Sequence, residues 1–178
     1  FCAATLRGLV RDRALLFGLD ALDDWELREW LLRHGARQST VDAPFIKAWY
    51  DLAFALTELH EYDKAVAAFA RALAINPKYT NAYYDKGLAL MHLNRFYEAV
   101  GAFDNALSID PDFADSHYYR GLALVALNRR SEAVEAFDAV LALVPGSADA
   151  AFHKGGSLFD LGNYKPAADA FSLAIEHN

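Results

Sequence analysis

A fixed interval of 34 residues constrains this chain more than any other feature. Residues 81–100 read NAYYDKGLALMHLNRFYEAV, and residues 115–134 read DSHYYRGLALVALNRRSEAV. Four sets of residues keep the interval without gaps: Gly87, Gly121 and Gly155; Ala65, Ala99, Ala133 and Ala167; Phe69, Phe103, Phe137 and Phe171; Pro77, Pro111 and Pro145. Such a period indicates an array of small structural repeats. The units span residues 46–79, 80–113, 114–147 and 148–178, and Ala53 holds the glycine place in the first.

Each unit has the pattern of two helices. In residues 80–113, apolar residues recur at helical spacing before and after Asn94, and Pro111 should end the second helix because proline lacks an amide donor. Short side chains let two antiparallel helices approach, so we expect Gly87 to face Ala99 and Phe103 to fill the wedge toward the next pair. Helices this short are marginal alone, so neighbouring pairs must cover one another. The sequence predicts an all-α superhelix.

These residues resemble the tetratricopeptide repeat family over residues 46–178. The first unit carries nearly the whole family pattern: Trp49, Leu52, Ala53, Ala65, Phe69, Ala72 and Pro77. The resemblance implies an α-α superhelix (a solenoid of helix-turn-helix repeats) that acts as a non-catalytic protein–protein interaction module. Lys86, Arg120 and Lys154 stand where the pattern prefers leucine. We expect their aliphatic stems to pack while their charges reach solvent.

Residues 1–45 lack the period, and we expect them to form a helical cap on the first repeat. The segment DDWELREWLLRHG has a capping-box start at Asp23 and Glu26 and a terminating glycine, Gly35. The next helix should begin with Asp42 as its N-cap and Pro44 in its first turn.

A weaker resemblance covers residues 1–56. It is similar to an internal helical segment of flavin-dependent oxidoreductases of the amine-oxidase and phytoene-desaturase type. That leaves a fragment or fusion derived from such an enzyme as an alternative. The chain has no glycine-rich dinucleotide fingerprint, so flavin binding is assigned to no residue.

Catalytic and metal-binding patterns are missing from the sequence. None of the six histidines has a His or Cys three or four residues away, so no metal site is predicted. His117 replaces the aromatic residue of Trp49 and Tyr83, which favours a packed ring. Residues 153–162 contain glycines and a lysine without the phosphate-loop spacing, and Cys2 has no histidine near it in sequence. We predict no enzymatic activity and no cofactor.

Charge and composition limit the classes of partner. The net charge is −7, and an acidic chain disfavours nucleic acid and anionic membranes. No apolar run approaches the roughly 18 residues of a membrane span. One cysteine allows no internal disulfide and suggests a reducing compartment, so a cytoplasmic location is expected.

The geometry of the resembled repeat places one face of each unit's first helix along a concave groove. Fourteen residues form the predicted peptide-binding set: Lys47, Tyr50, Asp51, Phe54, Asn81, Tyr84, Asp85, Leu88, Asp115, Tyr118, Tyr119, Leu122, Phe152 and His153. Asp149 and Gly156 belong to the same face. Each tyrosine has an alternative role, packing helix against helix.

Some family members hold a partner's C-terminal carboxylate with Lys and Asn. Tyr50, Asp51, Phe54, Tyr84 and Asp85 occupy the comparable places here, so that clamp is absent. We expect a partner segment with apolar anchors and Lys or Arg. An uncovered apolar edge after the last repeat leaves homo-oligomerisation, a self-assembling scaffold, as another alternative.

Overall fold

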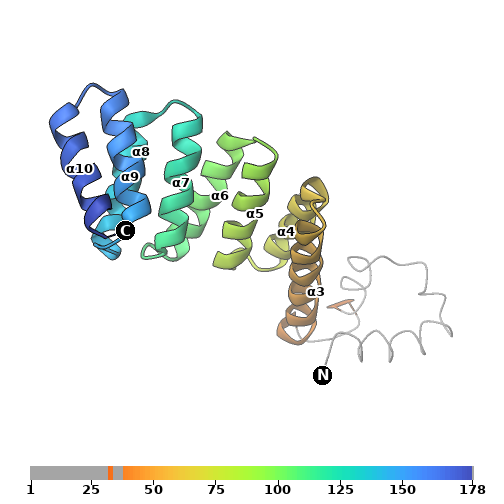
Figure 1. The fold of residues 1–178 in the computed structure, drawn as a ribbon. Coiled ribbons are helices and arrows are strands. Elements are labelled where there is room, and N and C mark those ends of the chain that lie inside the picture. Colours follow the sequence, from red (N-terminus) through yellow and green to blue (C-terminus); the bar gives the residue numbers. More distant parts are fainter. Residues whose placement is uncertain (1–31, 34–37, 178) are drawn as a thin grey trace. The chain divides into compact units, whose positions relative to one another are not determined.

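The computed structural model describes residues 32–33 and 38–177 (Figure 1). Eight α-helices and no strand occur in these residues: α3 (Gln38–Glu58), α4 (Tyr62–Ile75), α5 (Thr80–His92), α6 (Phe96–Ile109), α7 (Ala114–Ala126), α8 (Arg130–Leu143), α9 (Ala148–Asp160) and α10 (Tyr164–Glu176). The chain divides into two compact units, with the boundary after Pro77. The first unit contains α3 and α4, and the second contains α5–α10.

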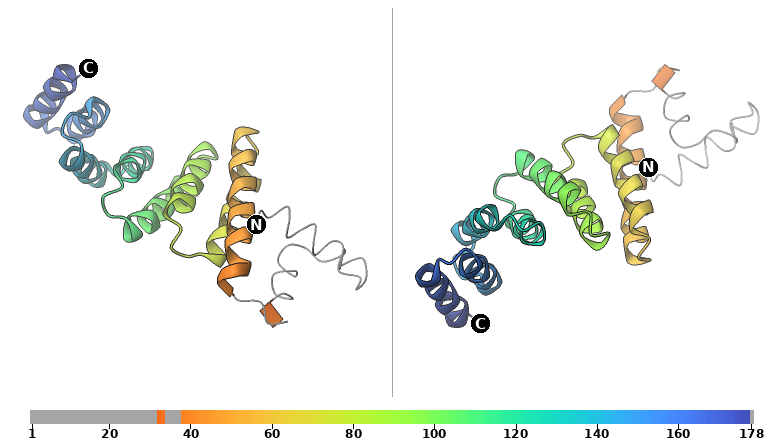
Figure 2. Two further views of the ribbon diagram at one scale, coloured as in Figure 1. Left: turned by 90° about the horizontal axis from the view of Figure 1, so that it is seen from below. Right: turned by 90° about the horizontal axis from the view of Figure 1, so that it is seen from above.

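The second unit consists of three helix pairs that follow one another in chain order (Figures 1 and 2). Within each pair the two helices pack together, as α5 with α6, α7 with α8 and α9 with α10. Each pair also contacts the next, because α6 packs on α7 and α8 packs on α9. The predicted all-α fold of stacked helix pairs is therefore confirmed.

Left-handed backbone conformations close the turns between the paired helices. Asn94 has φ 57°, Asn128 has φ 61° and Gly162 has φ 78°, and His60 adopts φ 58° in the first unit. Glycine and asparagine tolerate this region better than other residues. The second helix of the α5–α6 pair ends at Ile109, two residues before Pro111, as the sequence predicts.

A phenylalanine ring presses on the glycine of each pair. A Cβ atom placed on Gly87 would lie 2.5 Å from the ring of Phe103, and one on Gly121 would lie 2.6 Å from Phe137. The nearest atoms to Gly87 thus belong to Phe103 and not, as we expected, to Ala99. The position requires glycine, because the methyl group of an alanine there would overlap the phenylalanine ring.

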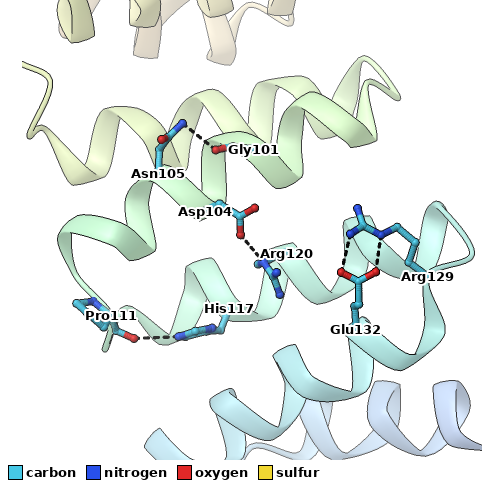
Figure 3. Close-up of polar contacts among 8 residues, drawn as sticks. All are labelled: Gly101, Asp104, Asn105, Pro111, His117, Arg120, Arg129 and Glu132. Atoms are coloured by element: carbon cyan, nitrogen blue, oxygen red, sulfur yellow. Dashed lines mark hydrogen bonds and ion pairs between the residues drawn. The ribbon is translucent and has the colours of Figure 1, made fainter.

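Ion pairs join the second helix of one pair to the first helix of the next. The Nε atom of Arg120 donates to Asp104 at 2.6 Å, as Figure 3 shows. Lys154 makes the equivalent ion pair with Asp138 at 2.6 Å. The Arg120 and Lys154 side chains are mostly covered but keep 23% and 26% of their surface exposed, and each charge lies at the surface beside an aspartate 16 residues earlier, a partner that the sequence reasoning did not name.

His117 is half-buried, and its ring makes a hydrogen bond to the backbone. Its Nε2 atom lies 2.9 Å from the carbonyl oxygen of Pro111, in the turn that precedes α7 (Figure 3). The same view shows two nitrogens of Arg129 donating to the carboxylate of Glu132, which joins the residue before α8 to the first turn of that helix. Both contacts fix helix starts in the second unit.

In the first unit, α3 begins at Gln38, so the predicted start at Asp42 was wrong. Pro44 lies inside the helix, where it removes a single backbone donor close to the N-terminal end. Ala53 is completely buried and takes the place that glycine holds elsewhere. The expected helix with Asp23, Glu26 and Gly35, and with it most of the predicted cap, lies outside the described residues.

Candidate partner-binding surface

The candidate surface is the row of aromatic rings on α5, α7 and α9, the first helix of each pair in the second unit. One predicted ring on each of these helices packs on the phenylalanine of its own pair. The ring centroids are 6.2 Å apart for Tyr84 and Phe103, 6.0 Å for Tyr118 and Phe137, and 5.7 Å for Phe152 and Phe171. These separations are those of favourable aromatic pairs.

A third ring from the next pair completes two of these contacts. Tyr119 stacks on Phe103 at 6.3 Å with an interplanar angle of 24°, and His153 stacks on Phe137 at 5.7 Å and 22°. We call each set of three a ring cluster: Tyr84, Phe103 and Tyr119 form the first, and Tyr118, Phe137 and His153 form the second. Tyr118 also contacts Tyr119, so the clusters touch.

The tyrosines pack on neighbouring rings and also keep part of their surface exposed. Phe103 and Phe137 are the fully buried members of the two clusters. Tyr84, Tyr118, Tyr119 and His153 are only half-buried, so each ring packs on one side and offers its remaining surface to solvent. The clusters therefore stabilise the stack and expose an aromatic surface.

Carboxylates surround this aromatic surface. Asp115 and Asp149 are exposed, and Asp85 is half-buried. Burial raises the pKa of Tyr84, and Tyr119, Asp115 and Asp85 raise it further, because each disfavours the charged phenolate. The exposed carboxylates therefore give this surface a negative character.

The second ring cluster has the same electrostatic character. Burial raises the pKa of Tyr118, and Asp149 adds to the rise. Burial lowers the pKa of His153 because it penalises the imidazolium, while Asp149 acts in the opposite direction. Burial thus favours the neutral form of the His153 ring, which packs beside a carboxylate.

The predicted residues of the first unit form a separate set. Tyr50 packs on Phe69 with centroids 5.8 Å apart, and Phe54 is 53% exposed. Lys47 and Asp51 form an exposed ion pair of 2.8 Å one helical turn apart. The relation found in the second unit, a first-helix ring on a second-helix phenylalanine, therefore recurs within α3 and α4.

The remaining predicted positions are less distinctive. Asn81 is exposed at the start of α5, and Leu88 and Leu122 are half-buried. Gly156 has no neighbouring side chain within 4 Å of a built Cβ atom. These four residues are not members of either ring cluster.

A pocket of about 440 Å³ lies between α9 and α10. Its lining is Ala148, Asp149, Phe152, Phe171, Ala174 and Ile175. Sequence reasoning placed Asp149 and Phe152 on the groove face but did not name Ala174 or Ile175. The signal was available, because Ala174 and Ile175 lie 34 residues after Val140 and Leu141.

The described residues contain neither a candidate metal centre nor a candidate membrane-spanning helix. Among residues 32–33 and 38–177, no three His, Cys, Asp or Glu side chains are grouped so that they could hold a metal ion. Within the same residues, no helix is both long and apolar enough to cross a membrane.

Sequence-family models match most of the chain. Tetratricopeptide repeat models match residues 46–79 and 80–113, and a further tetratricopeptide repeat model matches residues 118–177. The chain belongs to the tetratricopeptide repeat family. No curated protein sequence matches it. The weaker resemblance of residues 1–56 to flavin-dependent oxidoreductases stays a prediction.

Solved tetratricopeptide repeat structures share the fold. A crystal structure of MamA has a TM-score of 0.74 at 18% identity and covers 98% of this chain and 91% of its own. MamA from Desulfovibrio magneticus RS-1 has a TM-score of 0.70 at 22% identity and covers 86% and 92%. The first TPR of Spaghetti (RPAP3), bound to the HSP90 peptide SRMEEVD, has a TM-score of 0.63 at 19% identity and covers 66% and 93%.

Proposed function

We propose that this chain is a non-catalytic interaction module that binds a peptide or helix of a partner protein over the first helices of its second unit. The observation that carries the proposal is the half-buried aromatic surface of the two ring clusters with Asp115 and Asp149 beside it. Tyrosine is well suited to partner contacts, because a rigid ring gives a large contact area at a small entropic cost.

The aromatic surface and the carboxylates together favour one kind of partner segment. Apolar side chains of the segment pack on Tyr84, Tyr118 and Phe152, and its Lys or Arg side chains approach Asp115 and Asp149. Arginine and lysine also bind favourably to the faces of aromatic rings. An acidic segment is disfavoured, because it brings like charges to Asp115 and Asp149, the carboxylates that add to the effect of burial on the pKa values of Tyr84 and Tyr118.

The test compares two synthetic peptides in fluorescence-anisotropy titrations of the whole chain. One is a basic amphipathic peptide of leucine and lysine with a single tyrosine. The other is the acidic peptide SRMEEVD of the RPAP3 complex. We expect the basic peptide to bind more tightly and its affinity to fall as salt is raised. Tighter binding of the acidic peptide overturns the proposed charge preference.

A matched pair of variants locates the binding surface. Asp115→Asn with Asp149→Asn removes two exposed carboxylates from the first helices, and the basic peptide should bind about tenfold more weakly. Glu135→Gln with Asp169→Asn makes the same change in charge on exposed positions of α8 and α10. Equal losses in both variants would show that net charge alone, and not this surface, attracts the peptide.

A further inference from the structure

The pocket between α9 and α10 is lined by two of the three ring positions that form a ring cluster in the other pairs. Phe152 occupies the register position of Tyr84 and Tyr118, and Phe171 occupies that of Phe103 and Phe137. In both covered pairs a stacked ring from the following helix completes the cluster, Tyr119 in one and His153 in the other. The Phe152–Phe171 pair has the same spacing, with centroids 5.7 Å apart, and a pocket in place of the third ring.

Residues at equivalent positions of the α7–α8 and α9–α10 pairs differ in burial. Phe137 is fully buried, whereas its counterpart Phe171 is only half-buried. Leu141 is half-buried, whereas its counterpart Ile175 is 79% exposed. Phe152 is 57% exposed. The surface that α9 buries on the α7–α8 pair therefore faces solvent on the α9–α10 pair.

We propose that this pocket binds an aromatic side chain presented by an α-helix of a partner protein. The partner helix takes the position on α9–α10 that α9 takes on α7–α8, and its ring stacks on Phe171. The inference rests on the proposed function only in taking a protein as partner. The pocket can fail to bind a ring while the ring clusters still bind a basic segment.

The covered pairs also define the residues next to that ring. Ser116 and Ala150, three residues before Tyr119 and His153, are completely buried against the preceding pair. Positions three apart lie on one helix face, so the partner helix needs a small residue three positions before its ring.

A basic residue after the partner's ring is not required. Ser172 stands at the register of Asp104 and Asp138, the aspartates that pair with Arg120 and Lys154. The pocket volume of about 440 Å³ lies within the ~300–1,000 Å³ of typical ligand sites.

A second copy of this chain fits the pocket less well through its own first repeat helix. At the register of Tyr119 and His153, α3 carries Asp51, which is ion-paired with Lys47. A carboxylate cannot stack on Phe171. The covered pairs specify a helix with a ring at that register, and α3 does not supply one.

The test uses the chain's own ring-bearing helix as a probe. A synthetic peptide of residues 114–128, ADSHYYRGLALVALN, is titrated into the whole protein while the methyl NMR signals of Ala174 and Ile175 are followed. We expect saturable shifts of both signals. The peptide with Tyr119→Ala should bind about tenfold more weakly, as expected for the loss of a central aromatic anchor, and the peptide with Tyr119→Phe should bind as the parent does.

Two protein variants locate the binding. Ile175→Glu should abolish the shift of Ala174, and it should not unfold the protein because Ile175 is 79% exposed. Tyr97→Glu, at a position of similar exposure (72%) on α6, should leave the peptide affinity unchanged.

Three outcomes would overturn the proposal. The first is the absence of any shift at Ala174 and Ile175 when the basic peptide of the previous section still binds, which leaves the proposed function standing. The second is equal affinity of the parent and Tyr119→Ala peptides. The third is a dimer in sedimentation velocity that Ile175→Glu dissociates, which would make a second copy the occupant.

Discussion

The α7–α8 and α9–α10 pairs have the same internal contact and different surroundings. A Cβ atom built on Gly121 would lie 2.6 Å from Phe137, and one on Gly155 would lie 2.7 Å from Phe171. Phe137 is nevertheless fully buried and Phe171 is not, because α9 stacks His153 over Phe137. The comparison teaches that a pair's own sequence sets its crossing, while the following helix sets how deeply its phenylalanine is buried.

The largest expected difference between the two pairs is in the cost of losing the phenylalanine. Phe137→Ala should lower the free energy of unfolding by about 3–5 kcal/mol, the range for a fully buried ring. Phe171→Ala should cost about 1 kcal/mol, because the ring already meets solvent on one side. Urea unfolding followed by circular dichroism measures both. Equal costs would contradict the comparison.

Glycine substitutions separate the crossing from the open helix surface. Gly121→Ala should destabilise by about 1–3 kcal/mol, because the new methyl group overlaps Phe137. Gly156→Ala should instead stabilise by about 0.5–1 kcal/mol, since nothing lies within 4 Å of its built Cβ atom and alanine favours the helix. Thermal melts of the two single variants test the opposite signs. A Gly121→Ala variant as stable as the parent would mean that the ring can move aside.

Buried hydroxyl groups distinguish the first helices of the two pairs. The Ser116 hydroxyl on α7 is buried without a hydrogen-bond partner, whereas the Ser157 hydroxyl on α9 donates to the carbonyl oxygen of His153 at 2.9 Å. Ser116→Ala should therefore raise the free energy of unfolding by about 1 kcal/mol. Ser157→Ala is the matched control and should give no gain. Urea midpoints decide, and a loss of stability in Ser116→Ala would contradict the assignment.

The smallest effect concerns the ion pair between neighbouring pairs. A double-mutant cycle of Arg120→Ala and Asp104→Ala should give a coupling of about 0.2–1 kcal/mol, because the Asp104 side chain remains half exposed to solvent at 50%. The coupling should shrink in 1 M salt. A coupling above this range would show that the ion pair contributes more to the α6–α7 contact than a solvent-exposed pair does.

Much of the fold was readable from the period. The all-α class, the helix pairs and the burial of Phe103 and Phe137 followed from residues that recur every 34 positions. The start of α3 was not predicted correctly. Asp42 and Pro44 are typical of a helix start, but α3 already begins at Gln38 and continues through both residues. The ion pair of Arg120 with Asp104 was also missed. It joins α7 to α6, and the sequence of neither helix predicts how the two are rotated relative to each other.

The candidate site was predictable in its residues and not in their arrangement. Sequence reasoning selected Tyr84, Tyr118, Tyr119 and His153 for one face. It left open whether each ring packs or binds, because side-chain direction depends on the neighbouring pair. The structure puts Tyr119 and His153 on the preceding phenylalanines and leaves their outer surfaces exposed.

By itself, the sequence determined what each helix pair is. Glycine and phenylalanine at matched positions specify the crossing, and asparagine or glycine in the left-handed region closes the turn. Only the tertiary structure decided which rings are covered and which pocket stays open. The physical reason is that burial belongs to contacts between successive pairs, and a local pattern says nothing about whether a neighbour is in place.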